Sequence, residues 1–302
     1  MNSSSPGASV TIVGSANMDI VFGVDRIPGA GETVLATSAA RYPGGKGLNQ
    51  TVAAARAGAP TGFIGAVGYD DDGERLLLTM TDDGIDTALV RRSTADTGRA
   101  FITVDAQAEN AIVVSSGANA DVVTLTDLER ARLRSTGVLL MQLEVPLETV
   151  REAASVAHSA GVTVVLNAAP AQALPPELLA DLDVLIVNEH EACLVGGSDD
   201  LATASALLAV LVPRLIVTLG PAGSALFEAG EEVARVSAPS VVAVDSTGAG
   251  DTFCGAFAAA IAEGIGFVGA AEFATVAAAL SVQAVGAVPS IPFRASIEEA
   301  GA

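Results

Sequence analysis

Short apolar segments of strand length alternate with longer segments of helical spacing along the second half of the chain, and this pattern constrains the fold most. The predicted strands are 138–143, 162–167, 184–187 and 215–219, and the predicted helices between them include 147–159 and 201–211. Strands that alternate with helices form parallel sheets whose two faces are covered by helices. We therefore predict an α/β fold with a mainly parallel central sheet.

The first half of the chain departs from this alternation in two places. It opens with a predicted strand at 10–14, a helix that follows a glycine-rich turn at 44–50, and a strand at 61–67. Four further apolar segments lack an intervening helix, at 20–24, 32–40, 97–104 and 111–115. Such segments form antiparallel strands. We predict one domain spanning residues 1–302, with a small β-sheet inserted in two pieces, at about 18–43 and 97–116.

Residues 97–115 form a predicted hairpin of this inserted sheet. Side chains alternate between the two faces of a strand, so Ala100 and Ile102 share one face and Ile112 can join them from the partner strand. The same alternation directs Arg99 to the opposite face, where we expect it to meet solvent or a second copy of the sheet.

Composition excludes several classes of protein. The 302 residues carry a formal net charge of −20, which argues against binding to nucleic acid or to an anionic membrane. The longest apolar stretch, 253–288, is interrupted by Glu263 and Glu272 and predicts no membrane span. Residues 1–9 lack a secretory signal pattern, and Cys193 and Cys254 suit reduced thiols. We expect a cytoplasmic protein.

Polar side chains follow several predicted strands, where open α/β sheets bind ligands. The first half supplies Asn17, Asp19, Asn49 and Glu144, together with Lys46, which is the only lysine of the chain. Several acceptors around one cation suit a neutral polyhydroxylated ligand, whose hydroxyl groups need both donors and acceptors. These residues predict a pocket for a sugar-like molecule.

Residues 241–253 contain an apolar segment, a glycine-bracketed turn and the start of an alanine-rich helix. We predict a strand at 241–244 that leads into the turn, so that main-chain N–H groups at the helix start face an anion. Asp251 lies at this helix start and can either cap the helix or act as a base. Because two acids, two hydroxyl residues and two glycines fall within 245–251, we favour a phosphate cradle with a base beside it.

The second half also offers residues for a nucleotide and its metal. Asn188, Glu191 and the turn at 218–223 follow two neighbouring strands. The acid run at 70–72 lacks the spacing of a calcium loop, so we interpret it as a helix start without assigned chemistry. A sugar-like pocket beside a nucleotide site predicts phosphoryl transfer.

Eight segments in this order carry a resemblance to a known family. They are residues 14–19, 31–34, 44–50, 140–144, 167–170, 188–191, 245–251 and 286–290. The chain resembles the PfkB carbohydrate kinases, and within them the ribokinase group. The resemblance implies a ribokinase-like three-layer sandwich with a small β-sheet lid that closes over the sugar and pairs with the lid of a second subunit in a homodimer.

The resemblance also implies an ATP-dependent transfer of phosphate to the C5 hydroxyl of D-ribose. Residues that would hold the sugar are Asn17, Asp19, Gly45, Lys46, Asn49 and Glu144. Asp251 would be the general base, and the N–H groups of Gly248, Ala249 and Gly250 would stabilise the transferred phosphoryl group.

For the cofactors, the resemblance implies ATP, Mg²⁺ and an activating K⁺. The nucleotide would contact Asn188, Thr218, Gly220, Gly223 and Gly250, and Glu191 would hold Mg²⁺ through water. The monovalent cation would be held by Asp245, Thr247, Ser281, Ala284, Gly286 and Ser290, several of them through main-chain oxygens. Ala284 departs from the family, where an arginine is common.

Other functions remain open at this stage. A PfkB kinase for deoxyribose, another sugar or a nucleoside would keep most of these residues. A non-catalytic sugar sensor is disfavoured because it would need neither Asp251 nor Glu191. A dinucleotide-binding dehydrogenase is disfavoured because no Gly-x-Gly-x-x-Gly follows the first strand.

Overall fold

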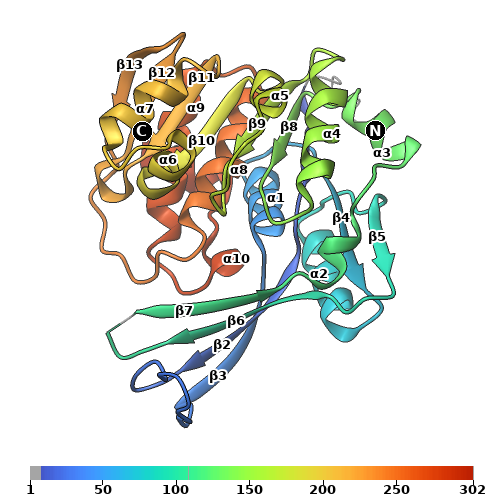
Figure 1. Cartoon of the computed structure of the whole chain (residues 1–302), viewed down its shortest axis with the longest axis vertical. Coiled ribbons are helices and arrows are strands. Elements are labelled where there is room, and N and C mark those ends of the chain that lie inside the picture. The colour runs from blue at the N-terminus through green and yellow to red at the C-terminus, as the bar shows by residue number, and fades with distance from the viewer. Residues whose placement is uncertain (1–7, 108, 302) are drawn as a thin grey trace.

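A mainly parallel sheet forms the centre of the computed structural model, which describes residues 8–107 and 109–301 (Figure 1). In these residues the sheet has nine strands. From edge to edge they are β13 (Glu231–Val236), β12 (Ser224–Glu228), β11 (Arg214–Thr218), β10 (Val184–Asn188), β9 (Thr163–Asn167), β8 (Val138–Met141), β1 (Val10–Val13), β4 (Thr61–Gly68) and β5 (Val90–Ser93). Only the pairings that involve β12 are antiparallel within this sheet. The predicted fold class is confirmed.

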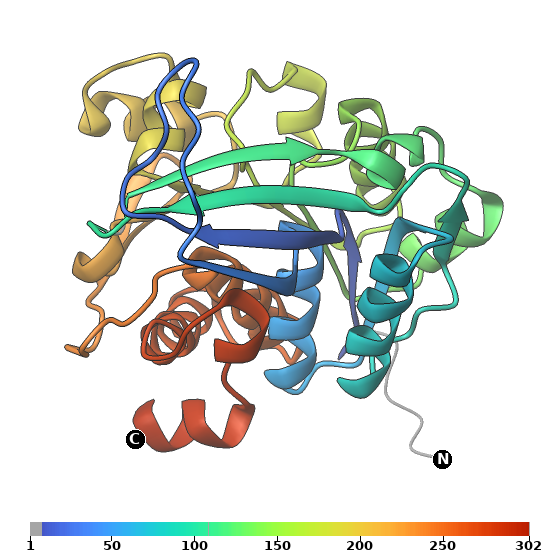
Figure 2. The same ribbon diagram turned by 90° about the horizontal axis from the view of Figure 1, so that it is seen from below.

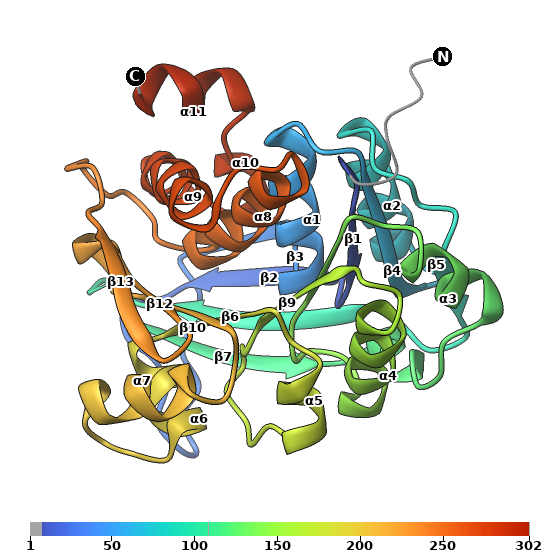
Figure 3. The same cartoon turned by 90° about the horizontal axis from the view of Figure 1, so that it is seen from above.

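Helices cover both faces of the central sheet, which gives three layers (Figure 3). One layer contains α1 (Lys46–Arg56), α2 (Asp71–Asp82), α8 (Ala249–Ala262) and α9 (Phe267–Ser281), with α10 (Ala287–Ser290) and α11 (Arg294–Gly301) beside them. The other contains α3 (Asp127–Leu133), α4 (Leu147–His158), α5 (Pro176–Ala180), α6 (Glu189–Gly196) and α7 (Leu201–Ala209). Each layer shares its own apolar core with one face of the sheet.

Helix α1 packs closely on two sides because a glycine lies at each contact. A Cβ atom at Gly255 of α8 would collide with the main-chain oxygen of Gln50 in α1. At the other side of α1, a Cβ atom at Gly47 would collide with the main chain of Ser15 after β1. The absence of side chains at both positions thus sets how closely α1 packs between β1 and α8.

A second, smaller sheet projects from the central one (Figures 1 and 2). Its strand order is β3 (Ser38–Gly44), β2 (Asn17–Gly23), β6 (Gly98–Val104) and β7 (Asn110–Ser115). The predicted hairpin is confirmed, with Ile102 opposite Ile112. The predicted strand at 32–40 is wrong in its bounds, because β2 pairs with β3 only from Ser38 onward and the preceding segment forms a long loop.

The predicted strand at 241–244 is not formed. Val242 is 83% exposed and Val244 is 61% exposed, and neither lies in a strand. The N–H groups of Val244 and Asp245 instead donate to the carbonyl oxygen of Val282, in the turn that follows α9. An apolar segment whose main chain bonds to a helix end rather than to a neighbouring strand has no partner to make it extended and buried.

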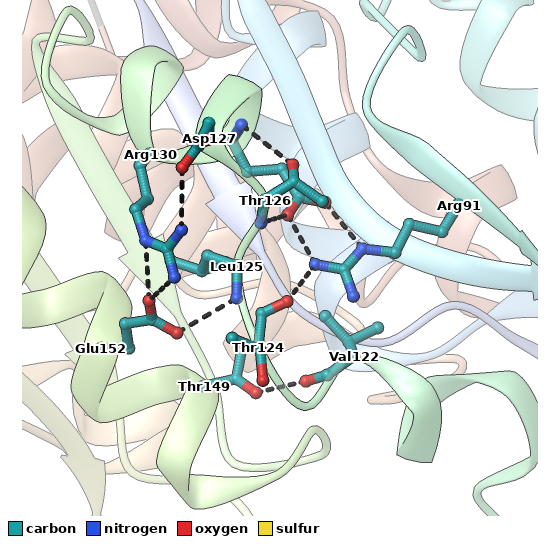
Figure 4. Close-up of polar contacts among 10 residues, drawn as sticks. Arg91, Val122, Thr124, Leu125, Thr126, Asp127, Arg130, Thr149 and Glu152 are labelled. Atoms are coloured by element: carbon teal, nitrogen blue, oxygen red, sulfur yellow. Dashed lines mark hydrogen bonds and ion pairs between the residues drawn. The ribbon is translucent and has the colours of Figure 1, made fainter.

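The segment that leads from the small sheet back to the central sheet is fixed by polar contacts (Figure 4). Arg91 of β5 donates to the carbonyl oxygen of Thr124 and forms an ion pair with Glu129. Thr126 and Glu129 form a capping box at the start of α3. Glu152 of α4 accepts from the N–H of Leu125 at 3.1 Å. These contacts hold residues 124–129, which follow the short 3₁₀ helix η2 (Gly117–Asp121), against the core.

Both cysteines within the described ranges are free thiols, in agreement with the prediction. Among residues 8–107 and 109–301, none of the helices combines the length and apolar character that a membrane crossing requires. Residues 1–7 of the segment tested for a secretory signal lie outside the described residues.

Candidate active site

The first group of candidate residues lies where β1 turns into β2. Asn17 begins β2 and is almost fully buried. Its Oδ1 accepts a hydrogen bond of 2.8 Å from Nδ2 of Asn119, which lies in η2. Asn119 Oδ1 in turn accepts from the main-chain N–H of Ala16 at 3.0 Å, which fixes the orientation of its amide. Asn17 therefore has its Nδ2 group left to donate to a ligand.

Asn119 is a residue that the sequence analysis missed. It lies about a hundred positions from Asn17 along the chain and belongs to no motif that predicts a site. Asn119 comes close to Asn17 only because the fold places β6 and η2 near β2. Gly98 of β6 completes this contact, since a Cβ atom there would collide with the side chains of both asparagines.

The start of α1 forms the second part of the site. Gly45 precedes the helix with a φ of 89°, a conformation that favours glycine. The carboxylate of Glu144 accepts from the N–H of Lys46 at 3.1 Å and from the hydroxyl of Ser15 at 2.5 Å. Glu144 therefore joins the loop after β8 to the loop after β1, at the same edge of the central sheet.

Asp251 lies in the first turn of α8 and is only 7% exposed. Its Oδ2 accepts from Nδ2 of Asn49 at 3.0 Å, and its Oδ1 accepts from Nε2 of Gln50 at 2.9 Å. The Oδ1 atom of Asn49 is buried and has no hydrogen-bond partner among the described residues. The structure thus brings the predicted base to the predicted sugar residues of α1, and it leaves a buried acceptor there for a hydroxyl group.

Several ionisable side chains lie near enough to Asp251 to interact with it electrostatically. Burial, reinforced by the negative charges of Glu144 and Asp251, raises the pKa of Asp19 to about 7. The pKa of Lys46 is raised chiefly by Asp251, although burial of the ammonium group opposes the shift. Burial is the main cause that raises the pKa of Glu191. The site is therefore rich in acidic groups and contains one cation, Lys46.

The glycine turn before α8 has the geometry of a helix start. Gly248 has a φ of 76° and accepts the first helical hydrogen bond, from the N–H of Thr252 at 2.8 Å. The N–H of Ala249 donates to the carbonyl oxygen of Ser246 at 3.2 Å. The N–H groups of a first helical turn otherwise lack intrahelical acceptors, so Gly250 and Asp251 offer donors beside the carboxylate.

The predicted nucleotide residues lie at the ends of β10 and β11. Asn188 and Glu191 form a capping box at the start of α6, with hydrogen bonds of 2.8 and 2.9 Å. Thr218 donates to the carbonyl oxygen of Val187 at 3.3 Å. Gly220 and Gly223 have positive φ values in the turn around η3 (Gly220–Ala222). All of these residues have a local structural role that is independent of a nucleotide.

The predicted cation residues lie in the loop before α8 and in the segment that runs from the end of α9 through α10. Asp245 Oδ1 accepts from the N–H and the hydroxyl of Thr247, and Oδ2 accepts from the N–H of Gly286 at 2.8 Å. Although burial opposes it, hydrogen bonding lowers the pKa of Asp245, so the carboxylate is held charged. The hydroxyl groups of Ser281 and Ser290 donate to main-chain oxygens of their own helices.

The acid run at 70–72 has a structural role that the sequence only partly predicted. Asp70 caps α2 by accepting from the N–H of Gly73, as expected of a helix start. Asp72 is buried and forms ion pairs with Arg99 of β6, at 2.8 Å, and with Arg41 of β3. Arg99 therefore pairs with α2 as well as keeping 28% of its side chain exposed, and the sequence did not predict this ion pair because alternation along a strand does not reveal the charge that packs beside it.

Comparisons with known proteins identify the family of this chain. The model of the pfkB family of carbohydrate kinases matches residues 8–294. The chain is 40% identical to a ribokinase of Bacillus subtilis over 295 residues, which cover 96% of this chain and 98% of the relative. A solved structure of Arabidopsis thaliana ribokinase, complexed with ribose and ATP, superposes with a TM-score of 0.91 at 35% identity, covering 97% of this chain and 98% of that one.

A nucleoside kinase of Methanocaldococcus jannaschii has the same fold. Its structure superposes with a TM-score of 0.83 at 20% identity, and the match covers 97% of this chain and 98% of that one. This similarity concerns the fold alone, so the shape of the chain does not separate sugars from nucleosides.

Proposed function

The chain belongs to the pfkB family of carbohydrate kinases, and we propose that it transfers the γ-phosphate of ATP to the C5 hydroxyl of D-ribose. The products are ribose 5-phosphate and ADP. One observation carries this proposal: the buried carboxylate of Asp251 lies at the start of α8 and accepts hydrogen bonds from Asn49 and Gln50 of the helix that Lys46 begins.

The sugar pocket consists of the residues that the sequence predicted. Asn17 offers an amide donor, Asn49 offers a buried acceptor without a protein partner, and Lys46 offers a cation. Asp19, Gly45 and Glu144 complete the set. A pentose with hydroxyl groups on both faces can pair with such a mixture of donors and acceptors.

Asp251 acts as the general base. It accepts the proton of the C5 hydroxyl while the oxygen of that hydroxyl attacks the γ-phosphorus of ATP. The new bond joins O5 to phosphorus, the bond from phosphorus to the bridging oxygen breaks, and ADP leaves with the electron pair of that bond. The N–H groups of Gly248, Ala249 and Gly250 stabilise the phosphoryl oxygens, and Gly250 is the best placed because Ala249 already donates to Ser246.

ATP is a substrate that binds with Mg²⁺ beside Asn188, Thr218, Gly220, Gly223 and Gly250. The described part of the chain holds no group of three or more His, Cys, Asp or Glu residues suited to a metal. The single carboxylate of Glu191 therefore fits an ion that keeps most of its water and is bound mainly by phosphates.

A potassium ion fits the loop of Asp245 and Thr247. The carboxylate of Asp245 is held charged by its hydrogen bonds, and Gly286 packs against it. We propose that Asp245 and the main-chain oxygens of Thr247, Ser281, Ala284, Gly286 and Ser290 hold the ion. Its positive charge would order the turn that precedes Gly248 and Asp251.

The small sheet is the proposed lid, and it also offers a surface for a homodimer. All six positions of β7 are exposed, among them Ile112, Val113 and Val114. Exposed apolar strands of this kind pair with a second copy.

Since the reaction consumes ATP and the cysteines are free thiols, we place the enzyme in the cytoplasm.

A coupled assay of ADP release tests the substrate. The panel contains ribose, 2-deoxyribose, hexoses and nucleosides, each measured with and without K⁺. We expect the highest kcat/KM with ribose and a higher rate with K⁺. Turnover confined to nucleosides would contradict the ribose assignment, and no turnover with any acceptor would favour a sugar sensor.

The Asp251→Asn variant tests the base. It keeps the shape of the side chain but removes its ability to accept the proton. We expect kcat to fall by roughly 10²-fold or more while ribose still binds, as measured by calorimetry. Retained turnover would falsify the assignment of Asp251.

A further inference from the structure

Three buried amide side chains form a continuous chain behind Asp251. Gln50 and Gln142 are fully buried, and Asn167 at the end of β9 is nearly so. Gln50 Nε2 donates to Asp251 Oδ1 at 2.9 Å and to Asn167 Oδ1 at 3.1 Å. Gln50 Oε1 accepts from Gln142 Nε2 at 2.5 Å. The sugar site as described above uses none of these three amides directly.

The main chain fixes the direction in which this amide chain points. Asn167 Nδ2 donates to the carbonyl oxygen of Ile186 in β10, at 3.3 Å, so Asn167 must present its oxygen to Gln50. Gln50 must then present its NH₂ group, and its two hydrogens go to Asn167 and to Asp251. The opposite orientation would place an amide oxygen against two other oxygens, which is unfavourable in a buried site.

Gln142 is the last member of this amide chain, and its buried position is energetically unfavourable. Its NH₂ group donates to Gln50, while its own Oε1 is buried without a partner among the described residues. Gly14 makes room for that oxygen, since a Cβ atom at Gly14 would collide with it. An unpaired buried acceptor is unfavourable, so the arrangement is one that stability alone would not select.

We propose that Gln50 is a positioning residue that holds the carboxylate of Asp251 in the orientation needed to accept the proton of the sugar hydroxyl. This inference rests on the proposed function. With Asn49 on Oδ2 and Gln50 on Oδ1, each oxygen of the carboxylate has one fixed donor, and rotation of the carboxylate breaks both hydrogen bonds. One lone pair of each oxygen remains free for the substrate.

Neutral donors suit this task better than a cation would. A hydrogen bond from an arginine or lysine is about twice as strong as one from a neutral amide, and it would lower the proton affinity of the base. Among the described residues, charged groups that interact with Asp251 include Lys46, Asp19 and Glu191. Amides fix the direction of the carboxylate without adding another positive charge to this set.

Two variants of Gln50 test the proposal through ribose kinetics. Gln50→Met removes both polar groups at similar length, and Gln50→Glu keeps the acceptor for Gln142 but replaces the donor to Asp251. We expect kcat to fall between roughly 10- and 100-fold in either variant, because a misplaced base costs rate. KM for ribose should change less than threefold. A kcat within twofold of the wild type in a folded variant would overturn the proposal.

The same substitution in an Asp251→Asn background separates positioning from general structure. If Gln50 acts through Asp251, Gln50→Met should not lower the residual turnover of Asp251→Asn further. An equal loss in both backgrounds would overturn the proposal. An active Asp251→Asn enzyme would overturn the base assignment and this inference together. An inactive Asp251→Asn enzyme beside a fully active Gln50→Met would overturn this inference alone.

Thr275→Val provides the matched control. Thr275 is buried in α9, and its hydroxyl donates to the carbonyl oxygen of Ala271. This change removes a buried polar group away from the site, so it should alter thermal stability but leave kcat within twofold of the wild type. A large loss of kcat in this control would show that kcat merely follows stability, which would also overturn the proposal.

Discussion

The two sheets of this protein are stabilised in different ways. The central sheet lies between two helical layers, and its strands β1, β4 and β8 are buried at every position. In the small sheet, every position of β7 is exposed. Burial of apolar side chains thus holds the central sheet, whereas the small sheet depends on strand pairing and on contacts at its base. The small sheet is therefore the less deeply buried of the two.

The base of the small sheet is held mainly by polar groups. Asp72 of α2 pairs with Arg99 and Arg41, and Asp70 accepts from both the N–H and the hydroxyl of Thr97. Directional contacts of this kind fix where a sheet begins without filling a core behind it. The proposed sugar residues Asn17 and Asp19 belong to β2 and therefore lie at this junction between the two sheets.

The largest expected loss of stability follows a substitution in the apolar core that the central sheet shares with its helices. Phe257 of α8 is fully buried between Phe253 and Phe267. Phe257→Ala should lower the free energy of unfolding by about 3–5 kcal/mol, because it leaves a cavity. Urea denaturation measures this loss, with Val113→Ala in β7 as the control in the small sheet. A loss below about 1 kcal/mol for Phe257→Ala would show that the central sheet does not depend more than the small sheet on buried apolar side chains.

The next largest expected effect is a pH-dependent change in stability at Asp19, which lies in β2 where the small sheet meets the central sheet. Its pKa is raised to about 7, so the folded protein keeps a proton there that the unfolded chain releases near pH 4. The stability that Asp19 contributes therefore falls as pH rises from about 4 to 7 and is lost above 7. Asp19→Asn should become more stable than the wild type over this range, by up to about 3 kcal/mol at pH 8.

Unfolding by urea at pH 5, 6, 7 and 8 measures this difference. Glu148→Gln, which changes an exposed acid of α4, serves as the control and should follow the wild type at all four values. A constant difference between Asp19→Asn and the wild type would show that the Asp19 proton is not retained in the fold.

A smaller effect is expected at the base of the small sheet. Asp72→Asn keeps the shape of the side chain but removes the charge that pairs with Arg99 and Arg41. Both arginines are partly exposed and can be solvated, so we expect a loss of about 1–2 kcal/mol. KM for ribose should rise several-fold while kcat at saturation changes little. An unchanged KM would mean that these ion pairs do not set the position of the sheet.

The smallest effect on stability is expected on the outer strand of the small sheet. Val113 is 69% exposed, and Val113→Thr keeps a β-branched side chain. The free energy of unfolding should change by no more than about 0.5 kcal/mol. Association into dimers, measured by sedimentation velocity, should weaken, because the apolar contact is lost. Unchanged association would place the dimer contact elsewhere.

The sequence predicted best those elements whose burial is set by periodicity. The apolar run that becomes β8 is buried throughout, and the register of Ile102 and Ile112 follows from alternation. The run at 241–244 has a similar composition, but its main chain bonds to the turn after α9. Apolar composition alone therefore does not decide whether a segment finds a neighbouring strand.

The candidate site was predicted where a motif keeps its residues together along the chain. Lys46, Asn49 and Gln50 belong to one turn and helix, and Asp251 belongs to another. Asn119 could not be found in this way, because its role depends on packing between η2 and β2. The partners of Arg99 were missed for the same reason, since the charged helix start lies 27 positions earlier.

The glycine contacts on the two sides of α1 limit how the substrate range of this enzyme can change. Because Gly255 lets α8 approach α1, and Gly47 lets α1 approach the main chain after β1, α1 cannot shift to admit a bulkier acceptor without losing one of these contacts. The distance between the proposed sugar residues and the proposed base is therefore fixed by the fold. New acceptors would have to be accommodated by changing side chains of the small sheet, which makes that sheet the place to begin when engineering specificity.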